Sequence, residues 1–130
     1  MKQPFLEAIK RVAEVYNAIV VYKSHVTVIC DPHGNIAFWD GMVPELGTAG
    51  SGDVLAGLIG GIVAIREAGN RRTGISLDGF SAMLAAEAAV VVHGLSGKKL
   101  AKAEGWFTAD RLIPQSALLA HDTMLTRKDH

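Results

Sequence analysis

The stretch Gly47-Thr48-Ala49-Gly50-Ser51-Gly52-Asp53 decides how this sequence of 130 residues is interpreted. Its glycines can adopt positive φ and bring successive backbone N–H groups together. Apolar residues at helical spacing follow directly, so we expect a helix from Asp53 onward. The unpaired N–H groups of a helix start point the same way as those of the loop. The stretch therefore predicts a cradle for a phosphate group or another oxyanion.

Asp53 lies where this loop becomes a helix. The helix dipole favours its ionised form by about 0.3–1 kcal/mol, and a carboxylate beside an anion cradle can accept a proton from a hydroxyl group. The alternative is a simple N-cap, formed by Ser51 or Asp53 after a flexible loop, and the loop alone does not decide between the two. We expect a side chain at Gly52 to force an unfavourable φ or to fill the space of the phosphate.

Before the loop, the pattern predicts one amphipathic helix and three strands. Apolar residues recur at helical spacing over 5–17, with charged residues on the other face. Short runs rich in β-branched residues predict strands over 19–22, 26–30 and 36–39. The turn residues 31–35 indicate that the last two strands form a hairpin.

After the strands, helices dominate. Residues 41–52 combine Pro44 with several glycines, so no regular element is expected there. A polar break at 69–74 is expected to end the first helix, and a second, buried helix is predicted over 77–95. A short helix begins near Thr108, its N-cap, and Pro114 is expected to disturb it.

Composition narrows the class of protein. Lysine plus arginine equal aspartate plus glutamate at 13 each, which argues against general nucleic-acid binding. The longest apolar run, 83–95, is too short and too interrupted to cross a membrane. A single cysteine, Cys30, and the absence of a signal-peptide pattern predict a cytoplasmic protein with a buried, inert thiol.

The run Gly47 to Gly57 resembles the C-terminal signature of the ribokinase-like kinases, in the form used by NAD(P)H-hydrate dehydratases. The segments 92–97 and 107–114 are similar to the family's His-Gly-Leu-Ala-Gly segment and closing helix. The resemblance implies an α/β fold, namely the C-terminal part of a three-layer α/β/α domain. Residues 1–125 are then expected to be its nucleotide-binding part, and 126–130 a disordered polar tail.

Residues 20–29 are similar to the family's strand, turn and strand. In that family a lysine and backbone groups of the turn contact nucleotide phosphates, and Lys23 and Thr27 fit the pattern. The resemblance therefore implies nucleotide binding by Lys23, Thr27, Gly50, Ser51 and Gly52. For Lys23 the alternative is a solvated lysine at a strand end.

The resemblance also implies a reaction, the dehydration of hydrated NADH or NADPH with ATP or ADP, accompanied by Mg²⁺. Phosphorylation of the ring hydroxyl creates a good leaving group. The backbone N–H groups of residues 50–53 would stabilise the charge of the phosphoryl group. Asp53 would bind the hydroxyl and take its proton. Two alternatives remain, a ribokinase-like kinase of a small molecule and a catalytically silent nucleotide-binding fragment.

Three short strands are too little sheet for so much apolar helix. We therefore expect a homo-oligomer or association with a missing N-terminal half, and no activity of the chain alone. No histidine spacing indicates a metal site. His93 is expected to be a hydrogen-bonded core residue, whereas Trp39 and Trp106 could each line a pocket or fill the core.

Overall fold

The computed structural model describes residues 3–73 and 82–125. Within them lie the helices α1 (Gln3–Tyr16), α2 (Ser51–Thr73), α3 (Ala82–Glu104) and α4 (Ala109–Leu125), the strands β1 (Val20–Tyr22), β2 (Thr27–Cys30) and β3 (Ile36–Trp39), and the 3-10 helix η1 (Pro44–Gly47). The elements follow the predicted order. The predicted tail at 126–130 and the predicted helical residues 77–81 lie outside the described residues.

The strands form one antiparallel sheet with β2 in the centre. Val28 of β2 pairs with Tyr22 of β1 and with Phe38 of β3. The predicted hairpin between β2 and β3 is confirmed. Its turn is held by Asp31, whose Oδ1 accepts the backbone N–H groups of His33 and Asn35, each at 2.9 Å.

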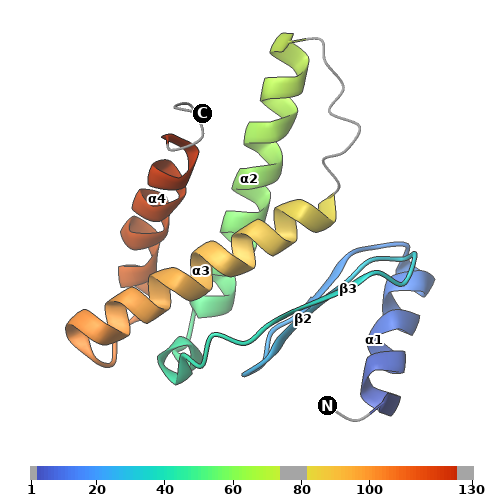
Figure 1. The fold of residues 1–130 in the computed structure, drawn as a ribbon, viewed down its shortest axis with the longest axis horizontal. Helices are drawn as coiled ribbons and strands as arrows, with labels where there is room; N and C mark the ends of the chain where they lie inside the picture. Colours follow the sequence, from blue (N-terminus) through green and yellow to red (C-terminus); the bar gives the residue numbers. More distant parts are fainter. Residues whose placement is uncertain (1–2, 74–81, 126–130) are drawn as a thin grey trace.

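The sheet is covered on both faces, which confirms a small three-layer α/β/α arrangement (Figure 1). Side chains of a strand alternate between its faces. Val28 and Cys30 therefore pack against Ile9 and Ala13 of α1, whereas Ile29 packs against the buried residues of α2 and α3. The α2 and α3 side of the sheet carries the larger part of the core.

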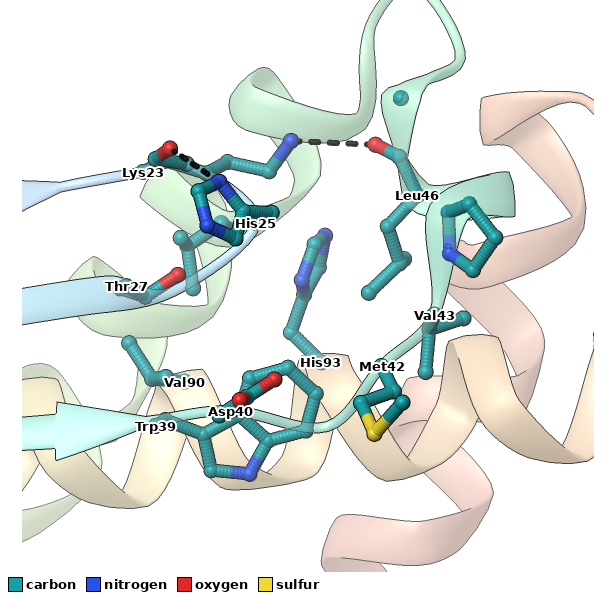
Figure 2. A pocket seen from close by; sticks show the side chains of 14 residues that line it. Lys23, His25, Thr27, Trp39, Asp40, Met42, Val43, Leu46, Val90 and His93 are labelled. Atoms are coloured by element: carbon teal, nitrogen blue, oxygen red, sulfur yellow. Dashed lines mark hydrogen bonds between the residues drawn. The ribbon is translucent and has the colours of Figure 1, made fainter.

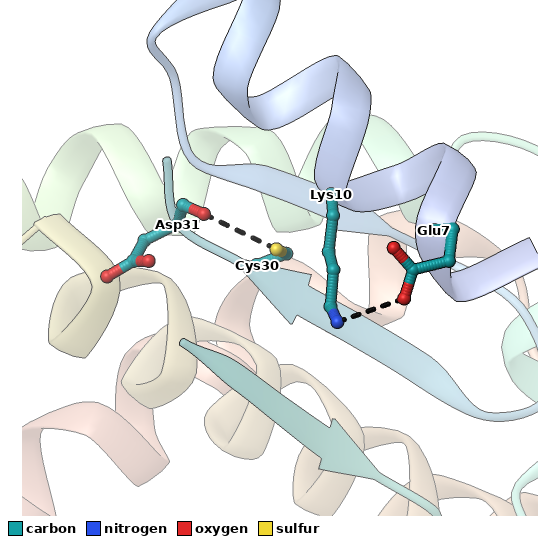
Figure 3. A network of polar contacts seen from close by, with 4 residues as sticks. All are labelled: Glu7, Lys10, Cys30 and Asp31. Atoms are coloured by element: carbon teal, nitrogen blue, oxygen red, sulfur yellow. Dashed lines mark hydrogen bonds and ion pairs between the residues drawn. The ribbon is translucent and has the colours of Figure 1, made fainter. Parts of the chain in front are cut away.

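Cys30 is a buried free thiol, as expected (Figure 3). Its Sγ donates to the Asp31 backbone carbonyl at 3.4 Å. Burial raises the pKa of the Cys30 thiol, and the nearby Asp31 carboxylate raises it further. Lys10 of α1 pairs instead with Glu7, at 3.1 Å. The thiol therefore stays protonated near neutral pH.

Two helices are longer than the sequence predicted. The expected break at 69–74 is wrong because α2 continues to Thr73, and α3 runs past residue 95 to Glu104. Gly94 lies inside α3 and does not end it. The residue is glycine because the Trp39 ring packs against the helix there, and a Cβ built at Gly94 would meet that ring at 2.1 Å. No helix within 3–73 and 82–125 is long and apolar enough to span a membrane.

Two prolines also behave differently from expectation. Pro44 begins η1, so the prediction of no regular element in 41–52 is wrong; proline suits a first turn because its missing N–H would be unpaired there. Pro114 lies inside the continuous helix α4. Leu112 and Ser116 lie two residues before and two residues after Pro114, and both are fully buried. Their packing keeps α4 in place on both sides of the proline.

Candidate functional site

The glycine-rich loop reaches α2 through Gly50, whose φ is +87°. A Cβ added at Gly50 would approach the Cβ of Ala109, at the start of α4, to 3.1 Å. The left-handed backbone and this close approach both favour glycine. Gly50 therefore fixes the direction in which the chain enters α2, and α4 supports the loop from behind.

Part of the predicted N–H cradle is already in use. Ser51 N–H donates to the Thr48 carbonyl at 3.3 Å, and Asp53 N–H donates to the Gly50 carbonyl at 3.1 Å. Within the described residues, the N–H groups of Gly50 and Gly52 donate to no protein acceptor. Among the N–H groups of residues 50–53, these two are therefore open to a ligand.

Gly52 is the second residue of α2 and has no positive φ. A Cβ built on Gly52 meets nothing within 4 Å. The expectation that a side chain here would force an unfavourable φ is wrong, because the backbone is already helical. A side chain at Gly52 would instead occupy open space at the first turn of α2.

Ser51 is completely buried and is bound by His93 of α3. The His93 Nε2 atom lies 2.9 Å from the Ser51 carbonyl oxygen and 3.2 Å from its Oγ. Because a carbonyl only accepts, Nε2 carries the proton. Burial lowers the pKa of His93; the bond to the Ser51 backbone acts in the opposite direction, and the charge of Lys23 lowers the pKa further. The prediction of a hydrogen-bonded core histidine is confirmed.

Asp53 points away from this buried link. Its side chain is exposed, whereas Ser51 and Leu55 on the same helix are buried. At roughly 100° per residue, Asp53 lies about 160° around the helix axis from both of them. Its carboxylate therefore faces the open side of α2, next to the free N–H of Gly52.

A pocket of about 840 Å³ opens beside this helix start (Figure 2). Its walls come from the ends of β1 and β2, the segment 39–47, α2 and α3. They comprise Lys23, Ser24, His25, Thr27, Trp39, Asp40, Met42, Val43, Pro44, Leu46, Gly47, Leu55, Val90 and His93. Of the predicted site residues, Lys23 and Thr27 line the pocket, whereas Gly50, Ser51, Gly52 and Asp53 do not. His93 connects the pocket with the glycine-rich loop, because it lines the pocket and binds Ser51.

Lys23 is exposed, but its ammonium group is bound to the protein. Its Nζ donates to the Leu46 backbone carbonyl at 3.1 Å (Figure 2). Leu46 belongs to η1, so the bond ties the end of β1 to the segment that leads into the glycine-rich loop. Partial burial lowers the pKa of the Lys23 ammonium. An ammonium has three N–H donors, so one bond to a carbonyl leaves capacity for an anion.

The rest of the pocket wall is largely apolar, and the sequence did not predict it. Trp39 is half-buried; it lines the pocket and also packs against the core. Trp106 is 74% exposed and does not line this pocket. Met42 and Val43 contribute from a loop. A loop has no periodicity that could have predicted their direction; only the glycine and proline content marked the segment.

Comparison with known proteins gives one consistent family. The family described as NAD(P)H-hydrate dehydratase matches residues 1–117. The chain is 38% identical over 105 residues to an ADP-dependent (S)-NAD(P)H-hydrate dehydratase of Xanthomonas campestris pv. campestris, covering 79% of this chain and 32% of that protein. A protein of the same description from Neisseria meningitidis serogroup B is 34% identical over 103 residues, 76% of this chain and 34% of that protein.

A shorter similarity links the chain to the bifunctional NAD(P)H-hydrate repair enzyme Nnr of Mycobacterium leprae. It is 42% identical over 57 residues, 44% of this chain and 12% of that protein. The chain thus spans about a third of the length of the two dehydratases and a smaller share of the bifunctional protein. No solved structure matches the chain significantly.

Proposed function

The chain belongs to the NAD(P)H-hydrate dehydratase family, and we propose that it supplies the nucleotide-binding part of an ADP- or ATP-dependent enzyme that dehydrates hydrated NAD(P)H. One observation carries this proposal. His93 lines the pocket and binds the buried Ser51 at the glycine-rich start of α2. His93 would therefore contact both the nucleotide site and the site of phosphoryl transfer.

The pocket fits a nucleoside diphosphate or triphosphate in size and chemistry. Its volume of about 840 Å³ lies within the range of roughly 300–1,000 Å³ that is usual for ligand sites. The Lys23 ammonium and the Thr27 hydroxyl, on a residue only 5% exposed, suit phosphate oxygens. Trp39, Met42 and Val43 provide an apolar wall for the flat base.

The start of α2 suits the phosphoryl group that is transferred. The N–H groups of Gly50 and Gly52 are open, the buried Ser51 is held by His93, and the positive end of the α2 dipole lies at the same place. Mg²⁺ would accompany the nucleotide, bound through phosphate oxygens and water as this ion prefers. Within the described residues no cluster of three acidic, histidine or cysteine side chains forms a separate metal site.

Asp53 is the proposed catalytic base. As the ring hydroxyl oxygen of the hydrated cofactor bonds to the terminal phosphorus, the bond between that phosphorus and the nucleotide's bridging oxygen breaks. Asp53 accepts the hydroxyl proton. The phosphorylated oxygen then leaves as phosphate, pushed out by the ring nitrogen's lone pair, and loss of a ring proton restores the double bond. The exposed position of Asp53 leaves room for this substrate.

A partner completes the proposed enzyme. Large apolar side chains are exposed on several elements, among them Tyr16 (75%), Phe38 (55%) and Ile65 (55%). Within the described sheet, β1 and β3 each have an unpaired edge. A second copy of the chain, or a polypeptide carrying the remainder of the family's domain, would cover these surfaces. We expect the chain without such a partner to be inactive, because residues 3–73 and 82–125 show no evident second pocket for the nicotinamide ring.

Calorimetry with ADP and with ATP, each with Mg²⁺, tests nucleotide binding directly. The wild-type chain should bind at least one of the two, and Lys23→Gln should weaken the affinity about tenfold or more, because a charge-assisted phosphate contact is lost. Lys10→Gln is the matched control, since Lys10 pairs with Glu7 on α1 and lies outside the pocket. Equal affinities for wild type and Lys23→Gln would remove Lys23 from the site.

A further inference from the structure

The Trp39 ring in the pocket wall is held in place by two glycines. The ring folds back over Gly41, and Gly94 of α3 lies against it, so that a Cβ built at either glycine would overlap the ring. The ring also packs against two of the buried core clusters. Trp39 is therefore a rigid part of the pocket wall, and a ligand that packs against it has no further rotamer to order.

Met42, which lines the same pocket, has an unusual backbone. Its φ is 52°, one of two positive values among the non-glycine residues that the structure describes. A left-handed backbone costs free energy in a residue that carries a Cβ. Because Met42 is 84% exposed, little packing within the chain offsets this cost. Strain of this kind at the wall of a pocket points to a role in ligand binding.

The charged groups of the pocket wall give a bound nucleotide one orientation. Figure 2 shows Lys23 at one end of the pocket and Asp40, Trp39 and Met42 at the other, with His93 between them. Phosphate oxygens are attracted by the Lys23 ammonium and repelled by the Asp40 carboxylate. The sugar and the base are then directed toward Trp39 and Met42. Hydroxyl and amino groups of a nucleoside can donate to the Asp40 carboxylate, whereas phosphate oxygens cannot.

We propose that Met42 is a specificity-determining residue of this site, and that its thioether packs on the base of the nucleotide while the fixed Trp39 ring contacts the same base. This inference rests on the proposed binding of a nucleotide in the pocket. A thioether is soft and polarisable, makes favourable contacts with aromatic rings, and adapts its shape through three rotatable bonds. The pair therefore selects nucleotides, which carry a flat aromatic base, over inorganic phosphates and sugar phosphates.

Met42→Gly separates the role in binding from the role in folding. Glycine adopts a positive φ without strain, so the urea denaturation midpoint should rise. Calorimetric affinity for ADP or ATP, whichever binds more tightly, should fall about threefold to tenfold, because the contact between sulfur and base is lost. The affinity for inorganic pyrophosphate, which has no base, should be unchanged.

Asn17→Gly is the matched control for this variant. Asn17 is the other non-glycine residue with a positive φ, 46°, and it follows α1 outside the pocket. Asn17→Gly also removes a side chain from a left-handed backbone, but it should leave the affinities for ADP, ATP and pyrophosphate unchanged. If Met42→Gly binds nucleotide as tightly as Asn17→Gly and the wild type do, Met42 does not contact the base.

Fluorescence tests the Trp39 contact without a change in the pocket. The chain has two tryptophans, and Trp106→Phe, at an exposed position outside the pocket, leaves Trp39 as the only one. ADP or ATP should change the Trp39 emission, whereas pyrophosphate should not. A nucleotide that binds without changing the emission, or pyrophosphate that binds as tightly as ADP, would overturn this inference and leave the proposed function standing. A wild-type chain that binds neither nucleotide would overturn both.

Discussion

The Nε2 atom of His93 lies 2.9 Å from the backbone carbonyl oxygen of Ser51, a residue 42 positions earlier in the chain. This bond attaches the middle of α3 to the first residue of α2. It also brings the pocket lined by Lys23 and Thr27 next to the loop that ends at Gly50. The predicted site is therefore assembled by a residue that the sequence marked only as structural.

The protonation of His93 should make stability depend on pH. Burial depresses its pKa below the ordinary value of about 6.5, so the unfolded chain takes up the proton first as the pH falls. The stabilisation is complete above about pH 6.5 and is lost as the pH falls toward the depressed pKa of the folded chain. Urea denaturation between about pH 8 and pH 5 measures how the free energy of unfolding declines over this range.

His93→Gln should flatten that pH dependence, whereas His33→Gln, in the exposed β2–β3 turn, should leave it as in the wild type. If the wild type and His93→Gln respond equally to acid, His93 is not the group responsible.

Gly50 and Gly52 should respond oppositely to alanine. Gly50→Ala places a side chain at φ +87° and against Ala109, so we expect the free energy of unfolding to fall by about 1–3 kcal/mol. Gly52→Ala puts a better helix former in open space and should gain up to about 1 kcal/mol. Chemical denaturation compares them directly. A loss at Gly52 equal to that at Gly50 would contradict the described helix start.

Occupying the space in front of Gly52 should still harm binding. Gly52→Val is expected to fold yet lose nucleotide affinity, because its side chain stands where a phosphate would approach the open N–H group. Calorimetry on the folded variant checks this, and unchanged ADP and ATP affinity would count against the loop as the phosphate site.

Gly94 should be intolerant of any side chain. A Cβ at this position would overlap the Trp39 ring, so Gly94→Ala must push the ring aside at a cost of about 1–3 kcal/mol. Gly60→Ala, where a Cβ meets nothing, is the control. Because Trp39 lines the pocket, Gly94→Ala should also shift its fluorescence. A stable Gly94→Ala chain with native fluorescence would show that the packing is looser than described.

The isolated chain should associate with itself. Its exposed apolar residues and open strand edges are the surfaces that a partner would cover. Analytical ultracentrifugation at micromolar concentration should show species larger than one chain. Ile65→Lys, on the exposed face of α2, should reduce the proportion of these species. A strictly monomeric chain at all concentrations would argue against association through a second copy.

The sequence predicted those elements well that depend only on residues close together in the chain. The strands rich in β-branched residues, the turn at Asp31 and the glycine-rich helix start are local features, and the structure contains each of them. Helix ends were harder: the predicted end at residue 95 falls between Gly94 and Gly97, inside α3. In three dimensions they are the places where Trp39 and Leu46 pack onto α3.

The site was predictable only in part, because its assembly depends on distant residues. The resemblance predicted Lys23 and Thr27, and the glycine-rich pattern predicted the start of α2 as part of the same site. The bond from Lys23 to the Leu46 carbonyl joins residues 23 positions apart, and no local pattern encodes it. The exposed direction of Asp53 follows from helix geometry once the helix is known to begin at Ser51 rather than Asp53.

Recovery of NADH absorbance from hydrated NADH tests the central claim most directly. The chain would be mixed with a polypeptide carrying the remainder of a dehydratase domain, with ADP or ATP and Mg²⁺. We predict that the absorbance recovers only when both polypeptides and a nucleotide are present. Asp53→Asn should abolish this recovery while the complex still forms. Asp110→Asn, in the first turn of α4, should leave the recovery unchanged. Full activity of the chain alone, turnover by Asp53→Asn within a few-fold of wild type, or a stable phosphate ester in place of NADH would contradict it.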